Sequence, residues 1–167
     1  MSQQLEIGKG TRLYKGVLIS AFIIVAMIGV AIWKDDPQFV SHIRAEITMK
    51  KISVNNHQLY VWVAKTPEQQ KVSLTNLVTM PQEEGVVFVF PEVGNYPVWT
   101  TNMHFAVDII WINDDGEVVD VAENVAPGLG YPANPKAPAR YVLMLNAGMI
   151  AQEGIIERTD IDLTKIL

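Results

Sequence analysis

The sequence predicts a mainly β domain, either a β-sandwich or a partly closed barrel with one or two short helices, preceded by a single transmembrane helix. Two turn signals and two fully apolar five-residue runs indicate roughly seven or eight short strands. A long uncharged run near the N-terminus indicates the membrane span. With 167 residues, 49% of them apolar, the chain has room for one globular domain and a small remainder.

The uncharged run is residues 16–33, GVLISAFIIVAMIGVAIW. As a helix rising 1.5 Å per residue it would be about 27 Å long, close to the thickness of a hydrocarbon core of about 30 Å. A buried core helix of this length would normally show a polar face, and this run has none. We therefore expect residues 16–33 to cross the cell membrane in contact with the lipid bilayer.

The flanking charges predict the orientation of this single-pass chain. Three bases precede the span (Lys9, Arg12 and Lys15), and two acids follow it closely. The positive-inside rule then places residues 1–15 in the cytoplasm. Residues 34–45 are expected to be a linker, and residues 46–167 an extracytoplasmic β domain. Signal-peptide cleavage is the alternative, but the apolar run is longer than the usual 7 to 15 residues, which favours an uncleaved signal anchor.

The first half of the domain combines a hairpin, a helix and a buried strand. ITMKKISV and HQLYVWVA flank Asn55-Asn56, a pair that tolerates positive φ and favours a two-residue hairpin turn. The Thr-Pro-Glu-Gln run at 66–69 predicts a capping box and the start of a short helix that ends near Leu77. VVFVF at 86–90 suits a strand that is buried on both faces.

A second hairpin and a long loop follow. Residues 105–112 and 117–122 flank Asn-Asp-Asp-Gly at 113–116, the strongest hairpin signal of the chain. Prolines and glycines between residues 123 and 140 preclude a regular ladder, so we expect a surface loop of the kind that often lines binding sites.

The C-terminal part predicts three short elements. YVLML at 141–145 is a buried strand, residues 147–153 form a short helix closed by Gly154, and DIDLTKIL at 160–167 forms a last alternating strand.

Charge and composition exclude several functions. Residues 1–34 carry four bases and one acid, a net charge of +3, whereas residues 35–167 carry nine bases and seventeen acids, a net charge of −8. An acidic domain repels phosphate backbones, so a nucleic-acid partner is not expected. With no cysteine and three widely separated histidines, the sequence predicts no metal site and no cofactor.

Asp108 is the most informative polar residue because it interrupts the apolar strand FAVDIIWI. A buried carboxylate is costly unless hydrogen bonds or a counter-ion satisfy it. Two interpretations remain open. In the structural one, Asp108 caps a turn or pairs with Arg140. In the functional one, it is a pocket carboxylate that acts with Glu123. The candidate ligand-binding residues are Trp99, Asn102, Asp108, Glu123, Tyr131 and Arg140.

Several segments, taken in order, resemble the domain of unknown function family 192, also known as uncharacterised protein family 0127. They are TPEQQ at 66–70, MPQEEGVVFVFPE at 80–92, Trp99 with Asn102 and Asp108, the hairpin DDGEVV, Glu123-Asn124 with Pro127, Tyr131-Pro132, and ARYVLMLNAG at 139–148. The resemblance covers residues 52–163. It implies a compact, mostly β domain, commonly placed after a signal peptide or membrane anchor. It does not point to any particular activity.

The chain departs from the family pattern beside the candidate site. The family usually has Trp-Met-Lys-Asn where this chain has Trp99-Thr100-Thr101-Asn102. If that lysine compensates a carboxylate or contacts an anionic ligand, Thr101 removes its charge. If the lysine makes only a surface salt bridge, its loss costs less than about 1 kcal/mol.

Three functions from different classes are compatible with these residues. The first is a membrane-anchored ligand-binding or accessory module of the cell envelope, with a small molecule or sugar as its ligand. The second is an enzyme that uses Asp108 and Glu123 as base and acid on an envelope sugar or small molecule. The third is a structural partner of other membrane proteins, which would contact them through Trp33, Phe39 and the span.

The signal-anchor prediction is tested by mass. Protein extracted from membranes should keep the full-length mass of 18.6 kDa, because an uncleaved span keeps its N-terminal residues. Intact-protein mass spectrometry measures this directly. Loss of the first thirty or so residues would show a cleaved signal peptide instead.

Overall fold

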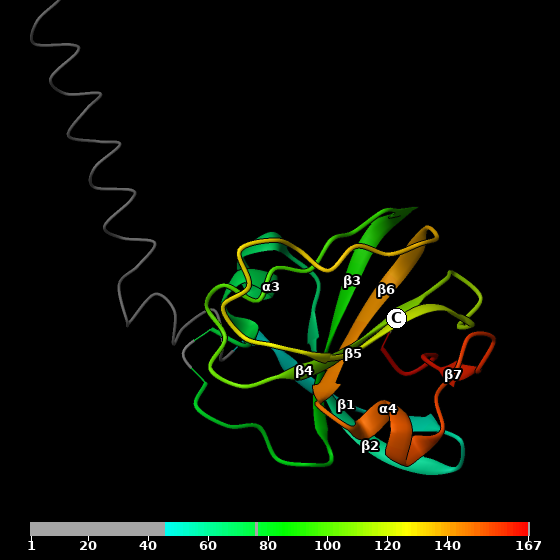
Figure 1. The fold of residues 1–167 in the computed structure, drawn as a ribbon. Coiled ribbons are helices and arrows are strands. Elements are labelled where there is room, and N and C mark those ends of the chain that lie inside the picture. The colour runs from blue at the N-terminus through cyan, green and yellow to red at the C-terminus, as the bar shows by residue number, and fades with distance from the viewer. Residues whose placement is uncertain (1–45, 76, 167) are drawn as a thin grey trace, which may run out of the picture. The chain divides into compact units, whose positions relative to one another are not determined.

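The computed structural model of the chain describes residues 46–75 and 77–166, in which seven strands and two short helices form the fold (Figure 1). In chain order these are β1 (Thr48–Val54), β2 (His57–Ala64), α3 (Pro67–Ser73), β3 (Glu84–Gly94), β4 (Val107–Ile112), β5 (Val118–Val125), β6 (Ala139–Asn146), α4 (Met149–Glu153) and β7 (Ile161–Asp162).

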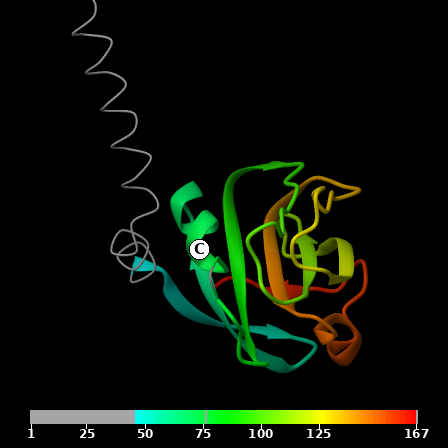
Figure 2. The same ribbon diagram turned by 60° about the vertical axis from the view of Figure 1, so that its left-hand side comes forward.

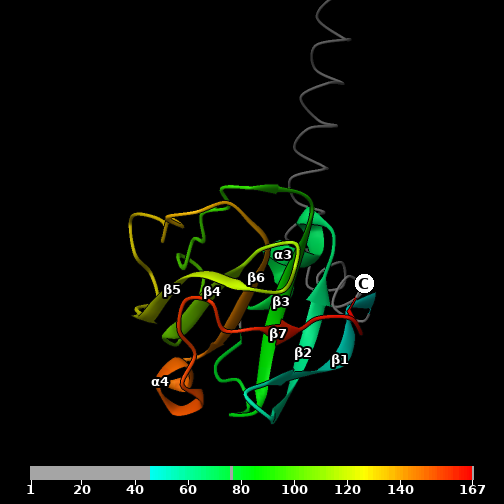
Figure 3. The same cartoon turned by 90° about the vertical axis from the view of Figure 1, so that its right-hand side faces the viewer.

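All seven strands belong to one curled sheet, in the order β5-β4-β6-β3-β2-β1-β7. Neighbouring strands are antiparallel except β2 and β3, which run parallel because α3 crosses over between them. The curl brings the chain around β7 back to the β4–β5 hairpin, where the Ile161 N–H donates to the Gly116 carbonyl at 2.9 Å. Figures 2 and 3 show this half-barrel from two further sides. The partly closed barrel is therefore confirmed and the β-sandwich is wrong, since no second sheet packs on the first within the described residues.

Both predicted hairpin turns and the capping box are confirmed. Asn55 and Asn56 have φ values of 46° and 69°, which give the turn between β1 and β2. At the start of α3, the Thr66 hydroxyl accepts from the Gln69 N–H at 3.2 Å, and the Gln69 side chain accepts from the Thr66 N–H at 3.3 Å. The helix ends at Ser73 rather than near Leu77, so it spans only two turns.

The central strands β3, β4 and β6 have apolar side chains on both faces. One face lies inside the curl with residues such as Val87, Ile110 and Leu143. The other face packs against α3 and the long connections, with Trp111 and Met144 fully buried. Burial on both faces explains why β3 and β6 contain the uninterrupted apolar runs VVFVF and YVLML.

Two C-terminal predictions are wrong in extent. β7 has two residues instead of eight, because the Asp162 carboxylate accepts from the Thr164 N–H at 3.0 Å and turns the chain. The helix α4 begins at Met149, two residues later than expected, and Gly154 ends it with a φ of 62°. Within the described residues, no helix is long and apolar enough to cross a membrane. The predicted span at 16–33 lies outside them.

Candidate functional site

Asp108 is completely buried in β4 and both of its carboxylate oxygens are occupied. Oδ1 accepts from the Asn124 N–H and Oδ2 accepts from the Ile150 N–H, each at 2.8 Å. Ile150 lies in the first turn of α4, whose N-cap, Gly148, makes no side-chain cap hydrogen bond. The carboxylate therefore satisfies a helix N–H that the helix itself leaves unpaired.

The β4–β5 ladder shows why Asn124 can reach this carboxylate. The register pairs Val107 with Val125 and Ile109 with Ala122, so two residues of β5 stand opposite Asp108 alone. This irregularity has the form of a β-bulge, and Asn124 adopts a φ of 51° within it. The turn-capping part of the structural interpretation is thus confirmed.

The predicted partnership between Arg140 and Asp108 is wrong. The Arg140 guanidinium lies 3.4 Å from the Asp114 carboxylate, at the tip of the β4–β5 hairpin. Glu123 is exposed on the bulge. The six candidate residues therefore do not converge on one site, because Asp108 is in the core and Arg140 is at the hairpin tip.

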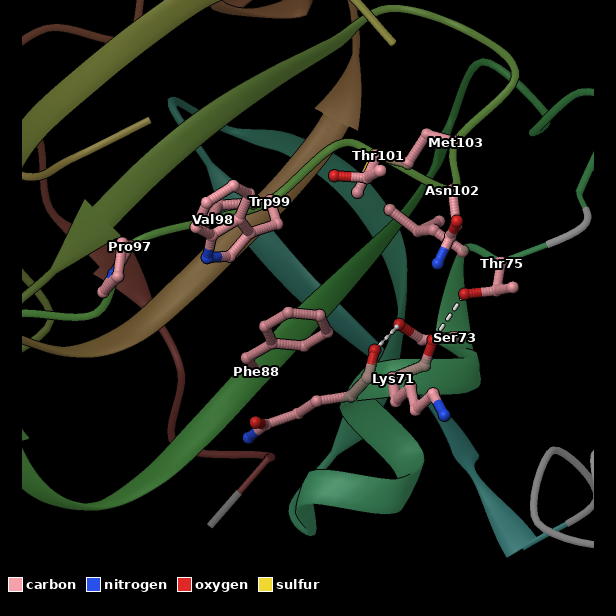
Figure 4. Close-up of a pocket in the computed structure, with 12 residues that line it drawn as sticks. Lys71, Ser73, Thr75, Phe88, Pro97, Val98, Trp99, Thr101, Asn102 and Met103 are labelled. Carbon is pink, nitrogen blue, oxygen red and sulfur yellow. Dashed lines mark hydrogen bonds between the residues drawn. The ribbon is translucent and has the colours of Figure 1, made fainter. Parts of the chain in front are cut away.

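Trp99 and Asn102 do lie together, in a pocket of about 320 Å³ between α3 and the connection that follows β3. The Trp99 and Phe88 rings lie on one side of this pocket, and Asn102 lies near Ser73 and the helix on the other (Figure 4). Its lining residues are Gln70, Lys71, Ser73, Leu74, Thr75, Phe88, Pro97, Val98, Trp99, Thr101, Asn102 and Met103. We call it the α3 pocket.

Hydrogen bonds of the two neighbouring residues fix the backbone around Trp99, so that its ring faces outward. Val98 pairs with Ala133 through two hydrogen bonds of 2.9 Å, and buried Thr100 donates its hydroxyl to the Ala126 carbonyl at 2.9 Å. Because side chains alternate along an extended segment, burial of Val98 and Thr100 directs Trp99 and Thr101 outward. The Trp99 side chain is consequently 56% exposed at the pocket.

The lining of the α3 pocket contains amides, hydroxyls, two aromatic rings and one lysine, but no carboxylate. Thr101 lines the pocket from the connection after β3, and Lys71 lines it from α3. Amides and hydroxyls donate and accept hydrogen bonds, and aromatic rings offer flat apolar surfaces. The pocket can therefore hold a small polar molecule that also has an apolar face.

Tyr131 is 67% exposed in the loop after β5 but does not line the α3 pocket. That loop is held by a buried carboxylate of β5. Asp120, only 2% exposed, accepts from the Lys136 backbone N–H at 2.9 Å and from its ammonium at 3.0 Å. Burial raises the pKa of Asp120, but the hydrogen bonds and charge of Lys136 outweigh it and leave the pKa below the ordinary value.

No group of three or more acidic or histidine side chains in the described part of the chain is arranged to hold a metal ion.

A family model matches residues 49–163, and the chain belongs to that family of unknown function, DUF192, described as "Uncharacterized ACR, COG1430". The match covers nearly all of the described residues, including the Asp108 contacts and the α3 pocket. No curated protein matches the chain.

Two solved structures share the fold. One is a candidate transcription regulator from Sinorhizobium meliloti 1021, which is 25% identical and has a TM-score of 0.67; the alignment covers 70% of this chain and 94% of that one. The other is a protein of unknown function from Novosphingobium aromaticivorans DSM 12444, which is 24% identical and has a TM-score of 0.63; the alignment covers 70% of this chain and 86% of that one.

Replacing Asp108 tests its structural role. Asp108→Asn keeps the shape but turns an amide NH₂ toward one of two backbone N–H donors, so a buried donor loses its acceptor. We expect the free energy of unfolding to fall by about 1–3 kcal/mol, measured by urea denaturation. Asp114→Asn, at a carboxylate that is 59% exposed, is the control and should cost less than about 1 kcal/mol. Equal stabilities of the two variants would contradict this role.

The lowered pKa of Asp120 predicts a pH dependence. An ionised Asp120 stabilises the fold above the unfolded-state pKa near 3.8, and this contribution is lost as the pH falls through the lower folded-state value. The stability difference between the wild type and Asp120→Asn should therefore shrink between roughly pH 5 and pH 2 in urea denaturation series. A difference that stays constant over this range would show that the carboxylate charge is not involved.

Proposed function

We propose that the chain is a membrane-anchored, extracytoplasmic module of the cell envelope that binds a small molecule or sugar in the α3 pocket. The anchor would be the apolar run at 16–33, with the N-terminus in the cytoplasm. The binding site would be the space between α3 and the segment that carries Trp99 and Asn102.

The observation that carries this proposal is the exposure of Trp99 at the mouth of a pocket. For stability alone, the Trp99 ring would be better buried than 56% exposed. The hydrogen-bonded backbone on both sides of Trp99 holds the ring in this exposed position. Such a ring can stack on the apolar face of a sugar, while Asn102 and the neighbouring hydroxyls hydrogen-bond its polar edge. The absence of carboxylates from the lining favours a neutral or anionic ligand over a cationic one.

The carboxylate-based enzyme is less well supported. Both oxygens of Asp108 accept backbone hydrogen bonds in a fully buried position, so a substrate proton has no free acceptor there. The role as a structural membrane-protein partner depends on Trp33 and Phe39, which lie outside the described residues. We do not extend the transcription-regulator description of the Sinorhizobium protein to this chain, since residues 35–167 carry a net charge of −8.

Replacing Trp99 tests the pocket. A thermal-shift screen of the full chain in detergent, against envelope sugars and small anions, should identify a ligand that raises the melting temperature. Trp99→Ala should then weaken binding of that ligand by about 1 kcal/mol, or roughly fivefold in Kd, in calorimetric titrations.

Tyr131→Ala is the matched control, because Tyr131 is an exposed aromatic residue that lies outside the α3 pocket. It should leave the Kd unchanged. Equal losses of affinity in the two variants, or an unchanged Kd in Trp99→Ala, would contradict a binding site at this pocket.

A further inference from the structure

An apolar patch lies where the described chain begins. Among the described residues, seven large apolar side chains are exposed, and three of them belong to this patch: Met49 at 38%, Tyr60 at 41% and Val78 at 76%. Met49 and Tyr60 come from β1 and β2, and Val78 comes from the segment between α3 and β3. We call this surface, together with Ile47 and Trp62, the β1 patch.

The strand register shows that the patch is continuous on the hairpin. Met49 pairs directly with Trp62, and Lys51 pairs with Tyr60, so these four side chains share one face of β1 and β2. Ile47 lies two residues before Met49 and therefore belongs to the same face.

A small cavity opens within this patch. It has a volume of about 150 Å³, and its walls are largely apolar, with Ile47, Trp62, Leu77 and Met80 among them. Leu77 and Thr79, the neighbours of Val78, both line the cavity, which joins Val78 to the hairpin part of the patch. The Trp62 indole N–H donates to the Glu84 carboxylate at 3.1 Å, so its polar end is satisfied and its ring is left for apolar contact.

One lysine lies on the face of the β1 patch. Lys51 pairs with Tyr60, whereas Lys50 pairs with Val61 and belongs to the opposite face. Glu84, the acid that lines the cavity, accepts the hydrogen bond of the Trp62 indole. Exposed aliphatic side chains, amphipathic aromatic rings and a lysine beside them are a combination that suits the interface of an anionic bilayer.

The patch lies close in sequence to the predicted membrane span. The linker between the predicted span and the domain has twelve residues, 34–45, and even fully extended it reaches at most roughly 40 Å. Ile47, which lines the cavity, is only two residues beyond the linker. We propose that the β1 patch rests on the lipid bilayer, with Lys51 facing anionic headgroups. This inference depends on the membrane anchor proposed above.

The absence of cysteine from the chain allows a direct test with single labels. The full chain is placed in nanodiscs of phosphatidylcholine with phosphatidylglycerol, carrying Val78→Cys in the patch or Val93→Cys as control, each modified with an environment-sensitive fluorophore. Val93 is a matched valine, 49% exposed, near the other end of β3. It lies roughly 30 Å along the strand from Glu84, which lines the patch cavity.

We expect spin-labelled lipid in the nanodisc to quench the label at position 78 at least several-fold more strongly than the label at position 93. Charge reversal by Lys51→Glu, or omission of phosphatidylglycerol, should reduce that quenching. Equal quenching at positions 78 and 93 in a chain that stays in the nanodisc after a high-salt wash would overturn the inference and leave the anchor intact. A chain that the wash removes would overturn both the anchor and this inference.

Discussion

The buried carboxylate of Asp108 is the constraint on which the rest of the domain depends. A charge with no access to water must be satisfied by nearby donors, and here two backbone N–H groups from different parts of the chain do so. Those donors fix the bulge of β5 at Asn124 and the first turn of α4 at Ile150. One side chain thus links β4, which lies between β5 and β6, to the bulge of β5 and to the first turn of α4.

This arrangement separates the residues that hold the fold from those that are available for binding. Asp108 and Asp120 are both buried carboxylates whose hydrogen bonds are to backbone or lysine groups of the domain itself. Asp120 holds the loop after β5 through Lys136, and Thr100 holds the neighbouring connection. With its support fixed in this way, Trp99 faces outward at the α3 pocket.

Most of the local structure could be predicted because its determinants are close together in the sequence. The two hairpin turns and the capping box at 66–69 depend on residues that are at most a few positions apart. The unusual position of Asp108 was also visible, since it interrupts an apolar strand. The family resemblance, which covers residues 52–163, agrees with the family-model match at 49–163.

The contacts that the sequence did not predict join residues far apart in the chain. The Ile150 N–H lies 42 positions from Asp108, and Lys136 lies 16 positions from Asp120, in a proline-containing loop that shows no pattern. The sequence also did not predict that α3 forms the wall of the pocket opposite Trp99, because the parallel crossover between β2 and β3 brings the helix there. Arg140 was assigned to the wrong acid for the same reason, since the curl of the sheet decides which hairpin tip it meets.

The central claim is that the Asp108 carboxylate is committed to the fold. Hydrogen–deuterium exchange, followed amide by amide with NMR, tests it most directly. If the claim is correct, the amides of Asn124 and Ile150 exchange as slowly as those of the central strand β6, although one lies in a bulge and the other in the first turn of a helix, where amides are normally unprotected. Exchange of these two amides as fast as that of the exposed loop after β5 would contradict it.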